Sequence, residues 1–287
     1  YISQIDTQKN MKIVKNLSEI SEIVSDLYKS QKKINLIPTM GNIHPGHLSL
    51  ITEANKFEGI NIVSIFINPA QFNDMDDFKN YPKTFEKDLE ILSKTSCKII
   101  FAPDKEAIYP KGVNSDKTIF KYRNILCDLV RFGHFDGVTT IVEILFDLIK
   151  PSKVFFGEKD FQQLKIIEQL IIQNELKIDL IKCPSIRDLN GMSLSSRYSS
   201  FTQDQKIKFA QCASIIKSNL INLKKNFNQT ILDNLQDELK GIGISKIDYC
   251  EVRDEDDLNL SKIKQRSRLF LAFYINKIRV IDNFILY

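Results

Sequence analysis

The sequence lacks tryptophan altogether and has only three histidines and five cysteines in 287 residues. The cysteines are odd in number, widely spaced and include no C-x-x-C pair; they are Cys97, Cys127, Cys183, Cys212 and Cys250. This pattern argues against a disulfide framework or a structural zinc site and favours a reducing, cytoplasmic location. No H-E-x-x-H motif is present either, so a zinc enzyme is poorly supported.

Long apolar runs and strongly one-sided charge are also missing. No run is long enough to cross a bilayer, so no membrane partner is expected. The first ten residues are polar, lack the apolar core of a signal peptide, and are interpreted as an extension ahead of a native-looking start at Met11. The net charge of +4 is mild and spread along the chain. Nucleic acid is therefore not the expected partner, because its binding proteins usually gather positive charge on one face.

Short apolar runs alternate with helical patterns in the first part of the chain. The strand-like runs are residues 34–37, 60–67, 97–102, 154–156 and 178–183, and the helical patterns are residues 48–57, 84–93, 138–149 and 161–172. This alternation predicts an α/β fold with a Rossmann-like, doubly wound parallel sheet. Such a sheet binds its ligand at the carboxyl ends of its strands.

The pattern changes after about residue 184. A loop rich in Ser and Arg, residues 186–200, leads to a capping box formed by Thr202 and Gln205, which predicts a helix start. Strand-like runs follow at residues 247–252, 268–274 and 278–281. We therefore expect a Rossmann-like domain over residues 1–183 and a smaller C-terminal α+β domain, with antiparallel strands, over residues 184–287.

Two of the three histidines, His44 and His47, lie in the segment PTMGNIHPGH between the first strand and the first helix. A helix that begins there offers free N–H groups and a positive dipole end to a phosphate chain. Gly41 and Gly46 let the backbone approach a ligand, and Pro45 pre-sets one φ angle without displacing the imidazoles. A single histidine is more often an ordinary loop or cap residue. The pair at this junction favours a site that stabilises charge on an α-phosphate and a leaving pyrophosphate.

The segment resembles the nucleotide-binding signature of the pantothenate synthetase family, which is similar to the HIGH-motif nucleotidyltransferases. Further matches follow in order at residues 64–72 (SIFINPAQF), 133–138 (GHFDGV), 156–164 (FGEKDFQQL), 194–197 (LSSR) and 281–283 (IDN). The resemblance covers nearly the whole chain from Met11. It implies an ATP-dependent ligase that joins pantoate to β-alanine through a pantoyl adenylate, and a homodimer. Mg²⁺ would be held by phosphates, substrate oxygens and water rather than by dedicated protein ligands.

The resemblance also assigns candidate site residues. The catalytic candidates are His44, His47 and Lys159, the last as a point charge for the phosphates. The ATP-binding candidates are Met40, Gly41, Asn42, Ile43, His44, Pro45, Gly46, His47, Gly157, Glu158, Lys159, Asp160, Ile186, Leu194, Ser195, Ser196 and Arg197, the Ser-Ser-Arg run resembling the triphosphate-gripping KMSKS loop. The candidates for binding pantoate and β-alanine are Gln71, Gln163, Asn68 and Met40. Neutral amides can hold a carboxylate and two hydroxyls while leaving the carboxylate nucleophilic.

Some of these residues have simpler explanations. Asp160 with Gln163 could form only a helix capping box, and Asn68 with the following proline could only end a strand. His134 is expected to be a structural hydrogen-bonding residue. The run over residues 127–132 departs from the L-E-G-x-x-R-P pattern of the family: the acidic residue is shifted by one, Phe132 replaces proline, and Arg131 is retained.

No cysteine or serine is placed as an acyl carrier, so the intermediate should stay non-covalent and the domain over residues 184–287 should act as a lid that excludes water. Two other functions fit parts of the pattern. A nucleotidyltransferase that stops after moving a nucleotide onto a phosphate leaves Gln71, Gln163 and the second domain unexplained. A nucleotide-binding sensor without turnover fits poorly with intact His44, His47 and Lys159. A tRNA synthetase fits poorly because the chain has no room for an anticodon-reading domain.

Overall fold

The computed structural model describes residues 11–113, 119–261 and 266–287, so the expected extension over residues 1–10 lies outside the described part. The chain forms two compact units. Of the described residues, the first comprises those up to Lys121, Phe132–Glu158 and Gln163–Pro184, and the second comprises Tyr122–Arg131, Lys159–Gln162 and those from Ser185 to Tyr287. Two short segments that precede residue 184 thus belong to the second unit, together with the C-terminal residues.

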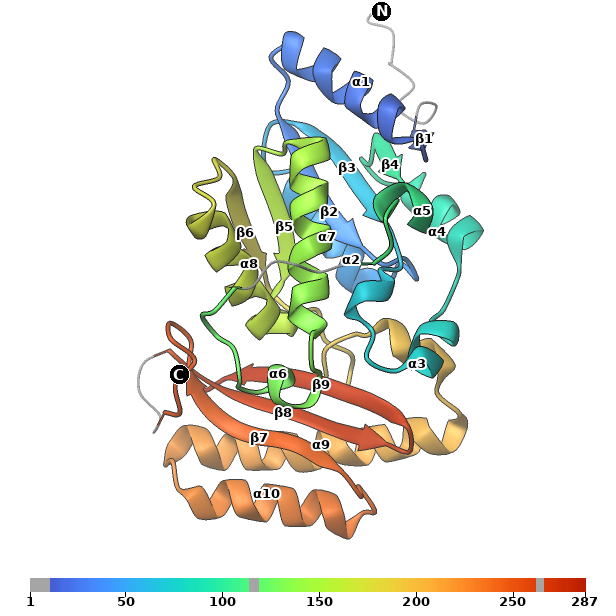
Figure 1. The fold of residues 1–287 in the computed structure, drawn as a ribbon. Coiled ribbons are helices and arrows are strands. Elements are labelled where there is room, and N and C mark those ends of the chain that lie inside the picture. Colours follow the sequence, from blue (N-terminus) through green and yellow to red (C-terminus); the bar gives the residue numbers. More distant parts are fainter. Residues whose placement is uncertain (1–10, 114–118, 262–265) are drawn as a thin grey trace, which may run out of the picture. The chain divides into compact units, whose positions relative to one another are not determined.

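The first unit is built on a parallel sheet of six strands in the order β1-β4-β3-β2-β5-β6 (Figure 1). The strands are β1 (Lys12–Val14), β2 (Ile34–Thr39), β3 (Ile60–Ile65), β4 (Ile99–Phe101), β5 (Lys153–Gly157) and β6 (Asp179–Cys183). Each of the five strand-like runs of the sequence coincides with one strand, and the predicted α/β fold with a parallel sheet is confirmed. The strand order reverses at β2, beside which both β3 and β5 lie, and this is where a doubly wound sheet binds ligands.

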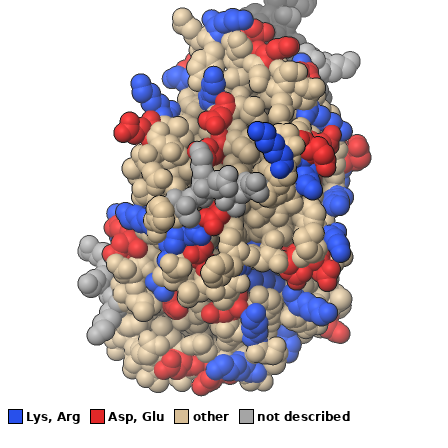
Figure 2. Space-filling model, in the orientation of Figure 1, with Lys and Arg blue, Asp and Glu red and all other residues tan. Residues whose placement is uncertain are grey.

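The helices of this unit are α1 (Leu17–Lys29), α2 (Pro45–Ala54), α3 (Met75–Lys79), α4 (Phe85–Leu92), α5 (Lys105–Ile108), α7 (His134–Ile149) and α8 (Phe161–Gln173), the last from Gln163 onward. Helix α2 packs on β2, β5 and β6, and α1 packs on α7. One buried cluster joins Leu50 of α2 and Leu92 of α4 to Ile37 of β2 and Phe155 of β5. Because side chains alternate along a strand, the neighbouring residues face the opposite side of the sheet, where α7 contacts β2. On the face drawn in Figure 2, basic and acidic side chains are interspersed.

The second unit contains an antiparallel sheet, β7-β8-β9, formed by β7 (Ile247–Asp254), β8 (Ser267–Ile275) and β9 (Ile278–Ile285). Helices α9 (Gln203–Lys225) and α10 (Gln229–Gly241) pack against this sheet and each other, and α6 (Cys127–Val130) is a single short turn. Their shared core includes Phe209, Leu239 and Phe273. The predicted capping box is confirmed: Thr202 Oγ1 accepts from the N–H of Gln205, whose side chain accepts from the N–H of Thr202. Among the described residues, no helix is both long and apolar enough to span a membrane.

The buried thiols should make stability sensitive to alkaline pH. All five cysteines are free and buried. Burial raises the pKa of Cys97 to about 11 and that of Cys183, Cys212 and Cys250 to about 12. An unfolded chain loses these protons from about pH 8.5 upward while the folded protein keeps them. We therefore expect the free energy of unfolding, measured in urea, to fall steadily between about pH 9 and pH 11.

Alanine at one of these positions tests the cause. Cys97→Ala should reduce the slope of stability against pH above about pH 9, since one thiol no longer titrates differently in the two states. An unchanged slope in this variant would assign the alkaline sensitivity to other groups.

Candidate active site

His44 and His47 lie together at the start of α2, directly after the carboxyl end of β2. His44 is the N-cap residue, and its Nδ1 accepts a hydrogen bond from the N–H of Gly46 at 3.1 Å. His47 Nδ1 accepts from the N–H of His44 at 3.3 Å, and the two ring centroids are 4.0 Å apart. Because Nδ1 accepts in both rings, each neutral imidazole carries its proton on Nε2. The helix start therefore presents two adjacent N–H donors of the kind that binds anionic oxygens.

His134 has the opposite arrangement. It is buried at the start of α7, and its Nδ1 lies 2.7 Å from the carbonyl oxygen of Gln71. A carbonyl can only accept, so Nδ1 of His134 must carry the proton. His134 is thus the structural hydrogen-bonding residue that its sequence context predicts.

These contacts predict the tautomer of every histidine in the chain. We expect His44 and His47 to be Nε2–H tautomers and His134 to be the Nδ1–H tautomer when neutral. Long-range ¹H–¹⁵N correlation spectra distinguish the two forms, and with three histidines the assignment is tractable by single substitution. An Nδ1–H tautomer at His47 would contradict the geometry of the site described here.

The backbone N–H groups of this segment are occupied by the protein itself. Gly41 N–H donates to Thr39 Oγ1 at 3.2 Å, and the N–H groups of Asn42 and Ile43 donate to the carboxylate of Asp88 at 2.9 and 2.8 Å. In the first turn of α2, the N–H groups of residues 46 to 48 bond to His44. The expectation of free N–H groups facing a phosphate is therefore wrong at these positions.

A second cluster of candidates surrounds the turn after β3. Asn68 is buried; its Nδ2 donates to the carbonyl of Gly137 at 2.9 Å, and its Oδ1 accepts from the Tyr109 hydroxyl at 2.6 Å. Burial raises the pKa of Tyr109 to about 12, so this hydroxyl keeps its proton into the alkaline range. Gln71 Nε2 lies 3.0 Å from the sulfur of Met40. Three of the four residues predicted to bind pantoate or β-alanine, Met40, Asn68 and Gln71, are thus brought together.

Gln163 lies near the carboxyl ends of the strands, the edge of the sheet at which this second cluster also lies. It lies on α8, which follows β5, and β5 is the neighbour of β2. Its side chain is half-buried. Gly157 and Glu158 form the junction between β5 and the short 3₁₀ turn Glu158–Asp160.

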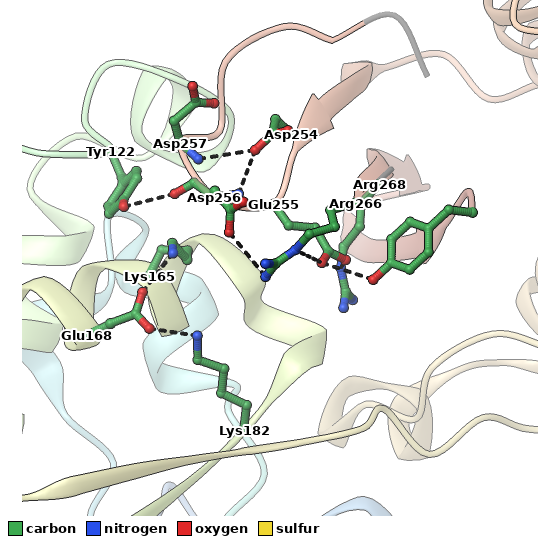
Figure 3. Close-up of polar contacts among 11 residues, drawn as sticks. Tyr122, Lys165, Glu168, Lys182, Asp254, Glu255, Asp256, Asp257, Arg266 and Arg268 are labelled. Carbon is green, nitrogen blue, oxygen red and sulfur yellow. Dashed lines mark hydrogen bonds and ion pairs between the residues drawn. The ribbon is translucent and has the colours of Figure 1, made fainter. Parts of the chain in front are cut away.

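In the second unit, Lys159 is held through its backbone. Its carbonyl accepts from Asn283 Nδ2 at 2.9 Å, and Asn283 Oδ1 accepts from Arg268 at 2.7 Å. Arg268 is itself buried and paired with Glu255, as Figure 3 shows. The side-chain nitrogen of Lys159 lies 3.7 Å from the carboxylate of Asp160. Hydrogen bonds from Arg268 in β8 and Asn283 in β9 thus hold the backbone of Lys159, from which its side chain extends.

The Ser- and Arg-rich segment is folded rather than an open loop. Residues 186–194 form a small hairpin in which Leu194 N–H donates to the carbonyl of Ile186. Ser195 then caps a 3₁₀ helix, Ser196–Ser200, by accepting from the N–H of Arg197 at 3.3 Å. Asp282 anchors the hairpin, accepting from the side chain of Arg187 and the N–H of Ser193. Burial raises the pKa of Asp282, and Arg187 partly offsets that effect.

Sequence reasoning missed three residues that organise these clusters: Asp88, Tyr109 as the partner of Asn68, and Arg268. The helix of Asp88 and the strand of Arg268 were predicted, and Tyr109 directly follows α5, but only the fold shows which groups these polar side chains contact. Among the described residues, no group of three or more His, Cys, Asp or Glu side chains is placed to hold a metal ion.

The chain is similar to one family of known proteins over nearly its whole length. A family model described as Pantoate-beta-alanine ligase matches residues 12–285. The chain is 41% identical over 279 residues to the pantothenate synthetase of Buchnera aphidicola subsp. Schizaphis graminum, covering 95% of this chain and 98% of that protein. It is 38% identical over 282 residues to the pantothenate synthetase of Acinetobacter baylyi, covering 95% and 98%.

Solved structures of similar fold include two from bacteria. The pantoate-beta-alanine ligase from Francisella tularensis, complexed with beta-gamma ATP and beta-alanine, has a TM-score of 0.84 and 34% identity, covering 96% of this chain and 98% of that chain. The pantothenate synthetase from Thermus thermophilus has a TM-score of 0.87 and 27% identity, covering 96% and 100%.

Proposed function

Since the chain belongs to the pantoate-beta-alanine ligase family and is therefore a pantothenate-forming ligase, we propose that its reaction runs through a pantoyl adenylate. ATP and (R)-pantoate would react first, and β-alanine would then displace AMP. The Francisella tularensis relative was solved with beta-gamma ATP and beta-alanine, which supports both molecules as substrates here.

In the first step, a carboxylate oxygen of pantoate attacks the α-phosphorus of ATP. A new O–P bond forms and the bond to the leaving pyrophosphate breaks. Negative charge repels the nucleophile and builds up on the phosphate oxygens, so donors that are already oriented lower the barrier. The observation that carries the proposal is the pair of His44 and His47 rings, 4.0 Å apart, whose Nδ1 atoms are used by the backbone and whose Nε2 atoms carry the protons.

In the second step, the neutral amine of β-alanine attacks the acyl carbon of the adenylate. The C–N bond forms, the C–O bond to AMP breaks, and the amine loses a proton as pantothenate is released. We propose that no enzyme side chain is acylated, and that the second unit shields the intermediate from water.

We propose that Gln71, Asn68, Gln163 and Met40 bind pantoate, and that the amide groups orient its carboxylate and hydroxyls. Lys159, with Ser195, Ser196 and Arg197, would contact the phosphates of ATP. Mg²⁺ would arrive with ATP and be held by phosphate oxygens and water. A homodimer and a cytoplasmic location complete the proposal, the latter because the five cysteines are free thiols.

A coupled assay tests this function. Purified protein with ATP, Mg²⁺ and pantoate is followed for pyrophosphate and AMP, with and without β-alanine. Multiple-turnover AMP release that needs both pantoate and β-alanine is the expected result. Pyrophosphate without β-alanine-dependent AMP would point to another acceptor, and absence of pyrophosphate would remove the adenylation step altogether.

A further inference from the structure

Asp88 is a buried carboxylate on α4 that has no place among the proposed substrate contacts. Its residue is 1% exposed. Its two oxygens accept from the N–H of Asn42 at 2.9 Å, the N–H of Ile43 at 2.8 Å and the hydroxyl of Thr84 at 3.1 Å. Asp88 therefore connects a helix 45 residues further along the chain to the backbone just before His44.

The backbone around these contacts has an unusual shape. Gly41 and Asn42 both have positive φ angles, 78° and 50°. In this turn the N–H groups of Asn42 and Ile43 converge on one carboxylate, as the successive N–H groups of a concave anion-binding site do. A Cβ built on Gly41 would lie 3.0 Å from Asp88 Oδ2, so the carboxylate sits tightly in this concavity.

The negatively charged group in this concavity is the side chain of Asp88 itself. A carboxylate that fills both N–H donors leaves no room for a phosphate there, and its negative charge repels one. The phosphate groups of ATP are thereby left to the adjacent histidine donors. The same hydrogen bonds stabilise the turn, in which Asn42 has a positive φ angle that costs free energy for a residue other than glycine.

We propose that Asp88 is a positioning residue for adenylation: by fixing the turn at residues 41–43 it sets the place from which His44 and His47 meet the α-phosphate. In its catalytic part this inference rests on the proposed function. Its structural part, that Asp88 holds the turn and the histidine pair, does not. Misplacing a catalytic group by about 1 Å can cost roughly 10²-fold in rate.

Asp88→Asn tests the proposal with little change in shape. An asparagine side chain offers one acceptor oxygen in place of two, and its NH₂ group would face a backbone N–H that needs an acceptor. We expect kcat for pantoate-dependent pyrophosphate release to fall by about 10²-fold. The KM for pantoate should change little, because Asn68 and Gln71 are held by separate contacts.

The matched control is Glu90→Gln on the same helix. Glu90 is an exposed carboxylate paired with Lys94, so its loss should leave kcat and KM unchanged. Should Asp88→Asn fail to fold, Thr84→Val removes one of the hydrogen bonds to the carboxylate with little change in volume. That variant should lower kcat several-fold in the same direction.

A structural readout separates this inference from the proposed function. Amide hydrogen exchange at Asn42 and Ile43, and the Nε2–H tautomer of His47, can be followed without turnover. We expect both amides to exchange faster and the tautomer ratio to shift in Asp88→Asn, but not in Glu90→Gln. If the wild-type protein released no pyrophosphate, the proposed function would fail while these measurements still tested Asp88. Wild-type kcat in Asp88→Asn, or unchanged exchange at both amides, would overturn the proposal.

Discussion

Replacing His47 with alanine is expected to lower pantoate-dependent pyrophosphate release by roughly 10²–10³-fold, the usual cost of losing one oriented transition-state donor. The reason is that His47 Nδ1 accepts from the N–H of His44, so a neutral ring carries its proton on Nε2, the donor that we propose for the α-phosphate. The effect should appear in kcat more than in the KM for pantoate, because charge on the phosphate grows only in the transition state. A steady-state assay of pyrophosphate with varied pantoate measures both quantities.

Two controls separate this role from helix capping. His47→Asn keeps an acceptor near the position of Nδ1 but has no donor in the place of Nε2, so it should be folded and as inactive as the alanine variant. Thr52→Ala changes an exposed residue of the same helix and should be nearly neutral. Activity within a few-fold of wild type in His47→Asn would show that His47 acts only as a cap.

Gly137→Ala should be the most damaging conservative substitution in the first unit. A Cβ at this position would lie 2.2 Å from the carbonyl oxygen of Ala70 and 2.7 Å from the N–H nitrogen of Gln71. These are backbone atoms of the turn Pro69–Gln71, so the turn and α7 must move apart. Overpacking of this kind typically costs about 1–3 kcal/mol or more in the free energy of unfolding. Displacement of Asn68 and Gln71 should also raise the KM for pantoate.

Gly241→Ala is the matched control. Gly241 ends α10, and a Cβ there would have no heavy atom within 4 Å. Alanine in a helix is favoured over glycine by about 0.5–1 kcal/mol, so this variant should be neutral or slightly more stable. Urea unfolding and pantoate titration of the two variants give the comparison. Equal stability of Gly137→Ala and the wild type would mean that α7 and the turn are not packed as described.

The sequence predicted the main sheet because its inner strands β2, β3, β4 and β5 are mostly buried and appear as continuous apolar runs. Strand β1, Lys12–Val14, was missed because it offers only two consecutive apolar residues between Lys12 and Lys15, and only Val14 is buried. Helix α1, Leu17–Lys29, was also left unassigned, although its buried residues Ile20 and Val24 follow helical spacing. The histidine pair was found because it lies at a strand-to-helix junction, a place that sequence can identify.

The contacts that hold the site could not be predicted in the same way. Asp88 is one of 36 acidic residues, and nothing in its neighbourhood distinguishes a buried carboxylate from a solvated one. Its importance depends on a turn 45 residues earlier adopting positive φ angles at Gly41 and Asn42. The same holds for Arg268, whose bond to Asn283 supports the backbone of Lys159. Long-range pairing of this kind is a property of the folded chain.

The most direct test of the pantoyl-adenylate mechanism is to follow oxygen. Pantoate labelled with ¹⁸O in its carboxylate is incubated with the protein, ATP, Mg²⁺ and β-alanine, and the AMP is examined by mass spectrometry. Attack of the carboxylate on the α-phosphorus, followed by cleavage of the acyl C–O bond, predicts one labelled oxygen in each AMP released. Unlabelled AMP, or label found in pyrophosphate or phosphate, would contradict the account.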